Sequence, residues 1–164
     1  MKKLILLLAA MLTLTANMAK SDDWDNAKEA WAYGLVTGDF TEALMIIKPL
    51  AEQGNAKFQN LMGEMYDIGE GVKQDKMEAM KWFYKAAKQG DVDAQVNLLI
   101  KYDYGTSVKQ DNLKAHMWFN IARDNGADLP DEVIRGIERR MTPAAINIAQ
   151  EMTERCLESN YKDC

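Results

Sequence analysis

Cysteine, histidine and proline are all scarce in this sequence, and positive charge is in deficit. Two cysteines and one histidine in 164 residues exclude a small disulfide-framework protein and a zinc site with four cysteine ligands. Three prolines leave room for long helices, because proline breaks a helix interior. Lys plus Arg total 20 and Asp plus Glu total 25, for a net charge of −5. No nucleic-acid partner is therefore expected, because affinity for the phosphate backbone comes from Lys and Arg replacing counterions.

What the sequence does contain suits one globular domain. Its 164 residues are close to the typical length of a single domain, about 150 residues. Hydrophobic residues make up 48% and charged residues 27%, a balance that argues against disorder.

The first 19 residues have the three-part layout of a bacterial secretory signal peptide. A basic start (Met-Lys-Lys) precedes an uncharged apolar run over residues 4–14, and small residues follow, with a cut after Ala16 or Ala19. The apolar run is shorter than the roughly 20 residues that span a bilayer, so a permanent transmembrane helix is the weaker interpretation. We therefore expect a periplasmic or secreted protein with no stable membrane insertion after signal cleavage.

The rest of the chain repeats itself at a fixed interval. Gly54, Gly90 and Gly126 lie 36 residues apart, and a shift by that interval superimposes many identical pairs. These include Tyr66 and Tyr102, Asp67 and Asp103, Gly69 and Gly105, Ala79 and Ala115, Trp82 and Trp118, Phe83 and Phe119, and Ala86 and Ala122. Self-similarity at such a period is typical of a solenoid array.

Each repeat unit is predicted to form two helices. The second half of a unit carries one apolar helical stripe, because hydrophobic residues recur at i, i+3, i+4 and i+7. In the best-defined unit these are Ala79, Trp82, Phe83 and Ala86. Asp39 and Asp75 each precede a glutamate by three residues, which predicts an N-cap at the start of a second helix. The Gly-Glu-Gly-Val segment over residues 69–72 is suited to end the first helix in a left-handed turn.

This pattern resembles the Sel-one-like repeat (SLR) family, which is related to tetratricopeptide repeats. The residues that carry the resemblance are Met62, Gly63, Tyr66, Gly69, Gly71, Val72, Asp75, Ala79, Trp82, Ala86, Ala87 and Gly90. The next copy departs at Leu99, Ser107 and Arg123. The resemblance covers residues 39–126. It implies an all-α fold, a right-handed α/α superhelical solenoid of helix-turn-helix repeats that holds other proteins without catalysis.

The tail is predicted to form C-terminal capping helices. One covers residues 131–140, and another begins with Thr142 as N-cap and Pro143 at the first helical position. Solenoids need atypical terminal units to cover their last apolar face. We therefore expect a signal peptide over residues 1–19, a repeat array over 20–128 and a cap over 129–164. Within the array, a degenerate first helix pair covers 21–54 and two repeats cover 55–90 and 91–126.

Cys156 and Cys164 are predicted to form a disulfide, because an exported protein meets an oxidising compartment. In a continuous helix eight residues rise about 12 Å, beyond the roughly 7 Å between Cα atoms that a disulfide tolerates. The last helix should therefore end near residues 158–160, and the tail should fold back. The alternative is a pair of free thiols on a frayed end.

No constellation of catalytic or metal-binding residues stands out, so no cofactor, metal or catalysis is expected. His116 has no second histidine or cysteine cluster to help it, which predicts an ordinary histidine on a helix surface. The alternative function is an envelope hydrolase of the penicillin-binding or β-lactamase-like type, which cysteine-rich secreted relatives of the family suggest. Those relatives carry a cysteine pair in each repeat, and the repeats of this chain carry none.

The resemblance also implies where a protein or peptide partner binds. In this repeat class the first helix of each pair lines the concave side. With Tyr66 and Tyr102 in the core, two strips of side chains are expected to face the partner: Asn60, Glu64 and Asp67, and their 36-residue counterparts Val96, Ile100 and Asp103. A partner with a basic segment beside an apolar anchor would match both strips. The alternative is that the C-terminal helices cover Val96 and Ile100.

Overall fold

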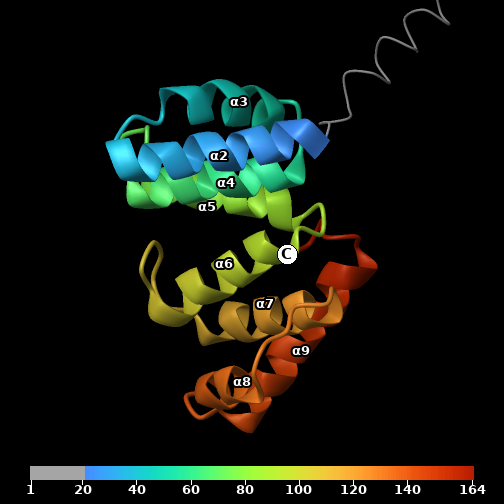
Figure 1. Ribbon diagram of the computed structural model, residues 1–164. Helices are drawn as coiled ribbons and strands as arrows, with labels where there is room; N and C mark the ends of the chain where they lie inside the picture. The colour runs from blue at the N-terminus through green and yellow to red at the C-terminus, as the bar shows by residue number, and fades with distance from the viewer. Residues whose placement is uncertain (1–20) are drawn as a thin grey trace, which may run out of the picture.

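Helices make up all the regular secondary structure of residues 21–164, the part of the chain that the computed structural model describes (Figure 1). The predicted signal peptide lies outside these residues. The helices are α2 (Ser21–Thr37), α3 (Thr41–Glu52), α4 (Ala56–Ile68), α5 (Lys76–Ala87), α6 (Val92–Tyr104), α7 (Asn112–Asp124), α8 (Asp131–Glu138) and α9 (Pro143–Glu158). From α2 to α7 each helix packs against its neighbours in sequence, as in a solenoid. The all-α prediction is confirmed. Within the same range no helix combines the length and the apolar character needed to cross a membrane.

Short polar side chains begin several helices by binding the first free backbone amides. The Asp75 carboxylate accepts hydrogen bonds from the amides of Met77 and Glu78, so it caps α5 as predicted. Thr142 accepts from the amide of Ala145 and caps α9, with Pro143 in the first turn. These two starts follow directly from the sequence.

Helix α3 begins one residue later than the Asp39 prediction. Its N-cap is Phe40, whose carbonyl accepts the first helical bond from the amide of Leu44 at 2.9 Å. The Asp39 carboxylate instead accepts from the amide of Thr41 at 3.0 Å. Phe40 makes no side-chain cap hydrogen bond, and its side chain packs into the hydrophobic core instead, with only 8% of the residue exposed.

The connection between the two helices of each unit is repeated in detail. Gly69 and Gly105 end α4 and α6 with φ of 83° and 66°, in the left-handed region that glycine adopts without strain. The loop that follows each glycine folds back and forms a backbone hydrogen bond to the helix that precedes it. The amide of Asp75 donates to the carbonyl of Tyr66 at 2.9 Å. In the next unit the amide of Asp111 donates to the carbonyl of Tyr102 at 3.0 Å.

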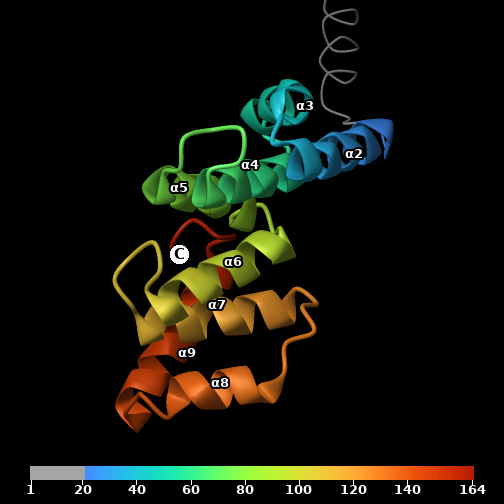
Figure 2. The same ribbon diagram turned by 60° about the vertical axis from the view of Figure 1, so that its left-hand side comes forward.

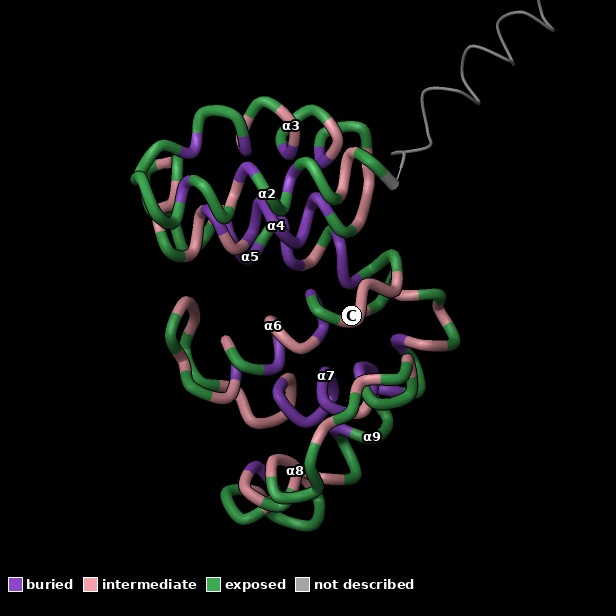
Figure 3. The backbone as a smooth tube through the Cα atoms, viewed as in Figure 1, coloured by how far each residue is buried: buried purple, intermediate pink, exposed green. Residues whose placement is uncertain are grey.

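Two hydrophobic cores share helix α5. Figure 1 shows α2 to α5 in one half of the molecule and α6 to α9 in the other. The apolar stripe predicted on α5 is buried, and Figure 3 colours the backbone by burial. The stripe contributes to both cores: Trp82 packs into the core between α2 and α5, whereas Phe83 packs into the core that runs on to α9. Trp118 and Phe119 of α7 are fully buried in that second core.

Buried glutamines join each helix pair to the one before it. Gln59 of α4 donates to the carbonyl of Ala51, at the end of α3, at 3.1 Å, and accepts from Gln89 at 2.7 Å. The counterparts 36 residues later are the bonds from Gln95 to the carbonyl of Ala87 at 3.2 Å and from Asn125 to Gln95 at 3.0 Å. Gln59 and Gln95 are 6% and 0% exposed, so their bonds to the carbonyls of Ala51 and Ala87 are shielded from water.

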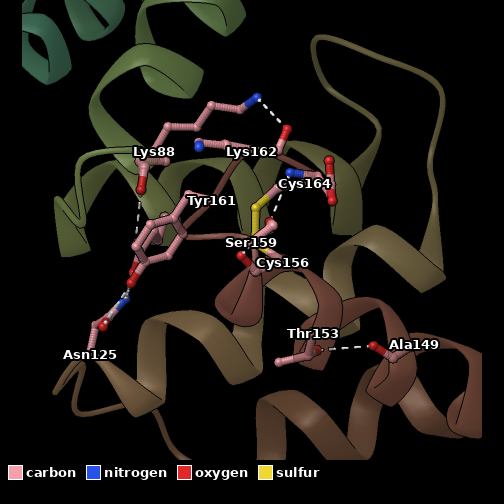
Figure 4. Close-up of a disulfide and its surroundings, with 12 residues drawn as sticks. Lys88, Asn125, Ala149, Thr153, Cys156, Ser159, Tyr161, Lys162 and Cys164 are labelled. Atoms are coloured by element: carbon pink, nitrogen blue, oxygen red, sulfur yellow. Dashed lines mark hydrogen bonds between the residues drawn. A yellow bond between two sulfur atoms is a disulfide. The ribbon is translucent and has the colours of Figure 1, made fainter.

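The last two helices pack against α7 (Figure 2). Helix α9 ends at Glu158, within the predicted range, and the chain reverses through Asn160 and Tyr161, which both have positive φ. A disulfide joins Cys156 to Cys164, whose Cα atoms lie 4.9 Å apart (Figure 4). The tail thus folds back toward the body of the molecule.

His116 is buried, and the prediction of a surface histidine is wrong. The residue is 2% exposed. Its Nδ1 lies 3.0 Å from the side-chain amide nitrogen of Asn120, and its Nε2 lies 3.3 Å from a carboxylate oxygen of Glu138. The reason is that α8 packs against α7 and covers this position, which the buried Met80 occupies in the previous unit. The 36-residue alignment of His116 with the hydrophobic residue Met80 was the signal that could have predicted burial.

Candidate functional site

The first helices of successive pairs, α2, α4 and α6, contribute to one continuous surface, here called the first-helix face. A cavity of ≈ 250 Å³ lies between α2 and α4. Hydrogen bonds between side chains link α4 to α6. All six predicted binding residues lie on α4 and α6, and the structure shows how each is placed.

Three polar side chains form a partly buried seam between α4 and α6. The side-chain amide of Asn60 donates to Glu64 at 2.9 Å. The amide of Asn97 donates to Asn60 at 3.0 Å and to the same oxygen of Glu64 at 3.4 Å. Burial raises the pKa of Glu64, and the hydrogen bonds from the two asparagines oppose this shift. No cation of residues 21–164 pairs with Glu64, so amides alone stabilise its charge.

Both predicted aspartates are paired with cations. Asp67 contacts the ammonium of Lys101 at 2.5 Å and the hydroxyl of Ser107 at 3.3 Å. The side chains of Asp67 and Lys101 are 17% and 12% exposed, so this pair is largely shielded from solvent. Asp103 forms an ion pair with Arg140, which lies between α8 and α9. Neither aspartate is therefore a free charge on the surface.

The apolar positions of the second strip remain partly accessible. Val96 is half-buried and Ile100 is 40% exposed, although Arg140 reaches the same helix at Asp103. Ile68 and Tyr104 lie four residues beyond Glu64 and Ile100, on the same helical faces, and are 54% and 71% exposed. The C-terminal ends of α4 and α6 thus add exposed hydrophobic side chains to the first-helix face.

The cavity between α2 and α4 was not predicted from the sequence. Its walls are Lys28, Trp31, Ala32, Leu35, Leu61 and Glu64. Leu35 is 61% exposed, and the indole nitrogen of Trp31 donates to the carboxylate of Glu70 at 2.7 Å. The first helix pair lacks the repeat motif, which is why these residues were missed. The i, i+4 spacing of Trp31 and Leu35 was the available signal.

This arrangement is suited to binding. Among residues 21–164 it combines an apolar hollow, a row of side-chain amides and one carboxylate without a cationic partner. Within the part of the chain that the structure describes, no three His, Cys, Asp or Glu side chains are grouped so that they could hold a metal ion.

Comparisons with known proteins agree with the repeat pattern. The Sel1 repeat family matches residues 56–91 and 93–126. One similar solved structure is a protective antigen of uropathogenic Escherichia coli with an SLR fold, at 28% identity and a TM-score of 0.72. The alignment covers 86% of this chain and 32% of the antigen, so the chain spans about a third of that protein's length.

A second similar structure is a Sel1 repeat protein from Oxalobacter formigenes, at 28% identity and a TM-score of 0.56. That alignment covers 65% of this chain and 83% of the other. No curated protein sequence matches the chain.

Proposed function

Because this chain is a Sel1-like repeat protein, we propose that it is an exported scaffold that binds a peptide segment of a partner protein in the cell envelope. Sel1 repeats generally mediate protein–protein interaction, and their fold is typically a non-catalytic scaffold. The observation that carries the proposal is the apolar cavity between α2 and α4, which opens beside the polar seam of α4 and α6. We place the binding site there, on the first-helix face.

The chemistry of the cavity defines the partner segment. An apolar side chain of the partner would enter beside Trp31 and Leu35, where burial of a large anchor supplies most of the affinity. A lysine or arginine next to that anchor would approach Glu64, the carboxylate that lacks a cationic partner among residues 21–164. Asp67 and Asp103 already have cations, so they support the face rather than select the partner.

Export is supported by two independent features. Residues 1–19 have the layout of a secretory signal, and Cys156 and Cys164 form a disulfide, a bond that persists in oxidising compartments. The direct test is mass spectrometry of the protein isolated from the periplasmic fraction. A mature chain that begins at Asn17 or Lys20 is expected, and an intact Met1 on cytoplasmic protein would contradict export.

Site-specific photo-crosslinking tests the position of the binding site. A photoreactive phenylalanine analogue at Leu35 should crosslink to a defined envelope protein, and mass spectrometry should identify the attached segment. The matched control is the same analogue at Val36, the next residue of α2, which is 87% exposed and does not line the cavity.

The crosslinked segment is then synthesised and its affinity is measured by calorimetry. Leu35→Glu should weaken its binding about tenfold or more, because a charge replaces a buried apolar contact, whereas Val36→Glu should leave binding unchanged. Equal crosslinking from both positions, or equal affinity of both variants, would show that the partner binds another face.

A further inference from the structure

A second cavity, of ≈ 510 Å³, lies against α5, away from the residues of the first-helix face. Its apolar lining comes from Met77 and Met80 of α5, Val108 after α6, and Cys164 at the end of the disulfide-bonded tail. Cavities of about 300–1,000 Å³ with mostly apolar walls are the usual size for small organic ligands. The tail that the disulfide holds in place therefore completes a hollow of ligand size.

The hydroxyl groups in this cavity leave one hydrogen-bond donor unused. Tyr84 and Tyr102 both line it, and their oxygens lie 2.7 Å apart. Lys114 also donates to the oxygen of Tyr102 at 3.4 Å. Two phenols carry two hydrogens, and their mutual bond uses one of them. The other has no acceptor among residues 21–164. Burial raises the pKa of Tyr84, so the Tyr84 hydroxyl keeps its proton at neutral pH.

Cationic side chains surround the same cavity, and within residues 21–164 no acidic side chain lines it. Lys81 pairs with Glu78 at 2.7 Å. Lys85 lies over the ring of Trp82 at 3.8 Å, and the ammonium of Lys88 lies 3.5 Å from the carbonyl oxygen of Lys162 (Figure 4). Neither Lys85 nor Lys88 has a carboxylate partner in the described chain. The charged side chains that line the cavity are thus all cationic.

In the next repeat unit, the face of α7 that corresponds to the cavity side of α5 is covered by another helix. Shifted by 36 residues, Lys81 and Lys85 correspond to Met117 and Ile121 of α7, which are 2% and 0% exposed. Helix α9 packs against α7. On α5 the equivalent face carries lysines, and within residues 21–164 no helix fills the hollow.

We propose that this cavity binds a small organic anion with an apolar body, of the class of a medium-chain fatty-acid carboxylate. Its chain would lie against Met77, Met80 and Val108. Its carboxylate would accept hydrogen bonds from Lys85, Lys88 and the free phenolic hydrogen. This site is independent of the proposed peptide site, and the failure of either leaves the other intact.

Calorimetric titration with decanoate tests the proposal on the mature protein. Saturable binding of one equivalent is expected, together with amide chemical-shift changes centred on Met80 and Val108. Decanol, which lacks the charge, and acetate, which lacks the apolar body, should bind far more weakly. Lys88→Gln should weaken decanoate binding by up to about fivefold, the upper end of what a charge pair contributes at an exposed position.

Two variants separate a local effect from a general one. Lys73→Gln removes the same charge from the exposed loop before α5 and should leave binding unchanged. Lys85→Gln should act like Lys88→Gln, and its melting temperature shows whether loss of the contact with Trp82 has disturbed the fold. The proposal is overturned if decanoate does not saturate, if decanol binds equally well, or if Lys73→Gln weakens binding as much as Lys88→Gln. Binding of a tetraglutamate peptide in place of decanoate would also overturn it and would assign the cavity to an acidic protein segment.

Discussion

Replacing Gln95 by methionine isolates the hydrogen bonds that join α6 to its neighbours. Methionine has nearly the shape of glutamine but neither a side-chain donor nor a strong acceptor. The variant loses the bond to the carbonyl of Ala87 and the bond from Asn125. Gln95 is fully buried, so water cannot replace its buried bond to the carbonyl of Ala87.

The expected loss of stability depends on the hydrogen bonds that Ala87 and Asn125 keep in the variant. The carbonyl of Ala87 still accepts from the amide of Gly90 at 3.0 Å. Asn125 still donates to the hydroxyl of Tyr161 at 2.9 Å. Neither group is left without a partner, so each lost bond costs its net value of about 0.5–1.5 kcal/mol. Gln95→Met should therefore lower the free energy of unfolding by about 2 kcal/mol, and the melting temperature by about 4–8 °C for a chain of this size.

Circular dichroism during thermal and urea unfolding measures this loss, with the urea m-value unchanged if the folded state keeps its compactness. Gln150→Met, at an exposed position of α9, is the matched control. A combined Gln95→Met and Asn125→Ala variant should lose less than the sum of the single changes, because the two side chains share a bond. A Gln95→Met shift no larger than the control, or strict additivity in the double variant, would refute the role assigned to this glutamine.

Three further changes test other parts of the structure. Glu64→Gln should raise the free energy of unfolding at pH 7, because burial raises the pKa of Glu64 above its ordinary 4.5. In the wild type, the cost of burying the charged carboxylate grows as pH rises through the folded-state pKa, and it vanishes below pH 4.5. Without reductant, the protein should have a mass two hydrogens below its reduced form. Opening the loop between Cys156 and Cys164, eight residues apart, should cost roughly 2–3 kcal/mol in the chain-entropy description. Trp82→Ala should cost roughly 3–5 kcal/mol, the range for removing a large aromatic side chain from a packed core.

Each of these measurements has a clear contrary result. A gain from Glu64→Gln that persists unchanged below pH 4.5 would show that the carboxyl charge is not its cause, and Glu151→Gln on an exposed position is the control. Two alkylatable thiols in exported protein would rule out the disulfide. A Trp82→Ala melting shift equal to that of a surface substitution would mean that Trp82 does not belong to the core.

The 36-residue repeat predicted which helix positions are buried in the core. It did not predict which side chains pair with one another between successive units. Trp82 and Trp118 were placed in the core because the same residue recurs 36 positions later on a helical stripe. Asp67 was expected on the surface, yet it pairs with Lys101, 34 residues away. Such a contact depends on the rotation between successive units, which periodicity does not encode. The cavity at Trp31 and Leu35 was missed for a related reason, because its helix pair lacks the repeated motif.

Helix α5 makes the two halves of the molecule depend on each other, because it sends Trp82 into one core and Phe83 into the next. In an array whose units touch only their neighbours, cooperativity is carried by such shared elements. Fraying that starts at either end of the stack therefore becomes global once it reaches α5. Amide hydrogens of α5 should exchange with solvent only through unfolding of the whole chain, whereas those of α2 and α9 exchange through local opening of the ends.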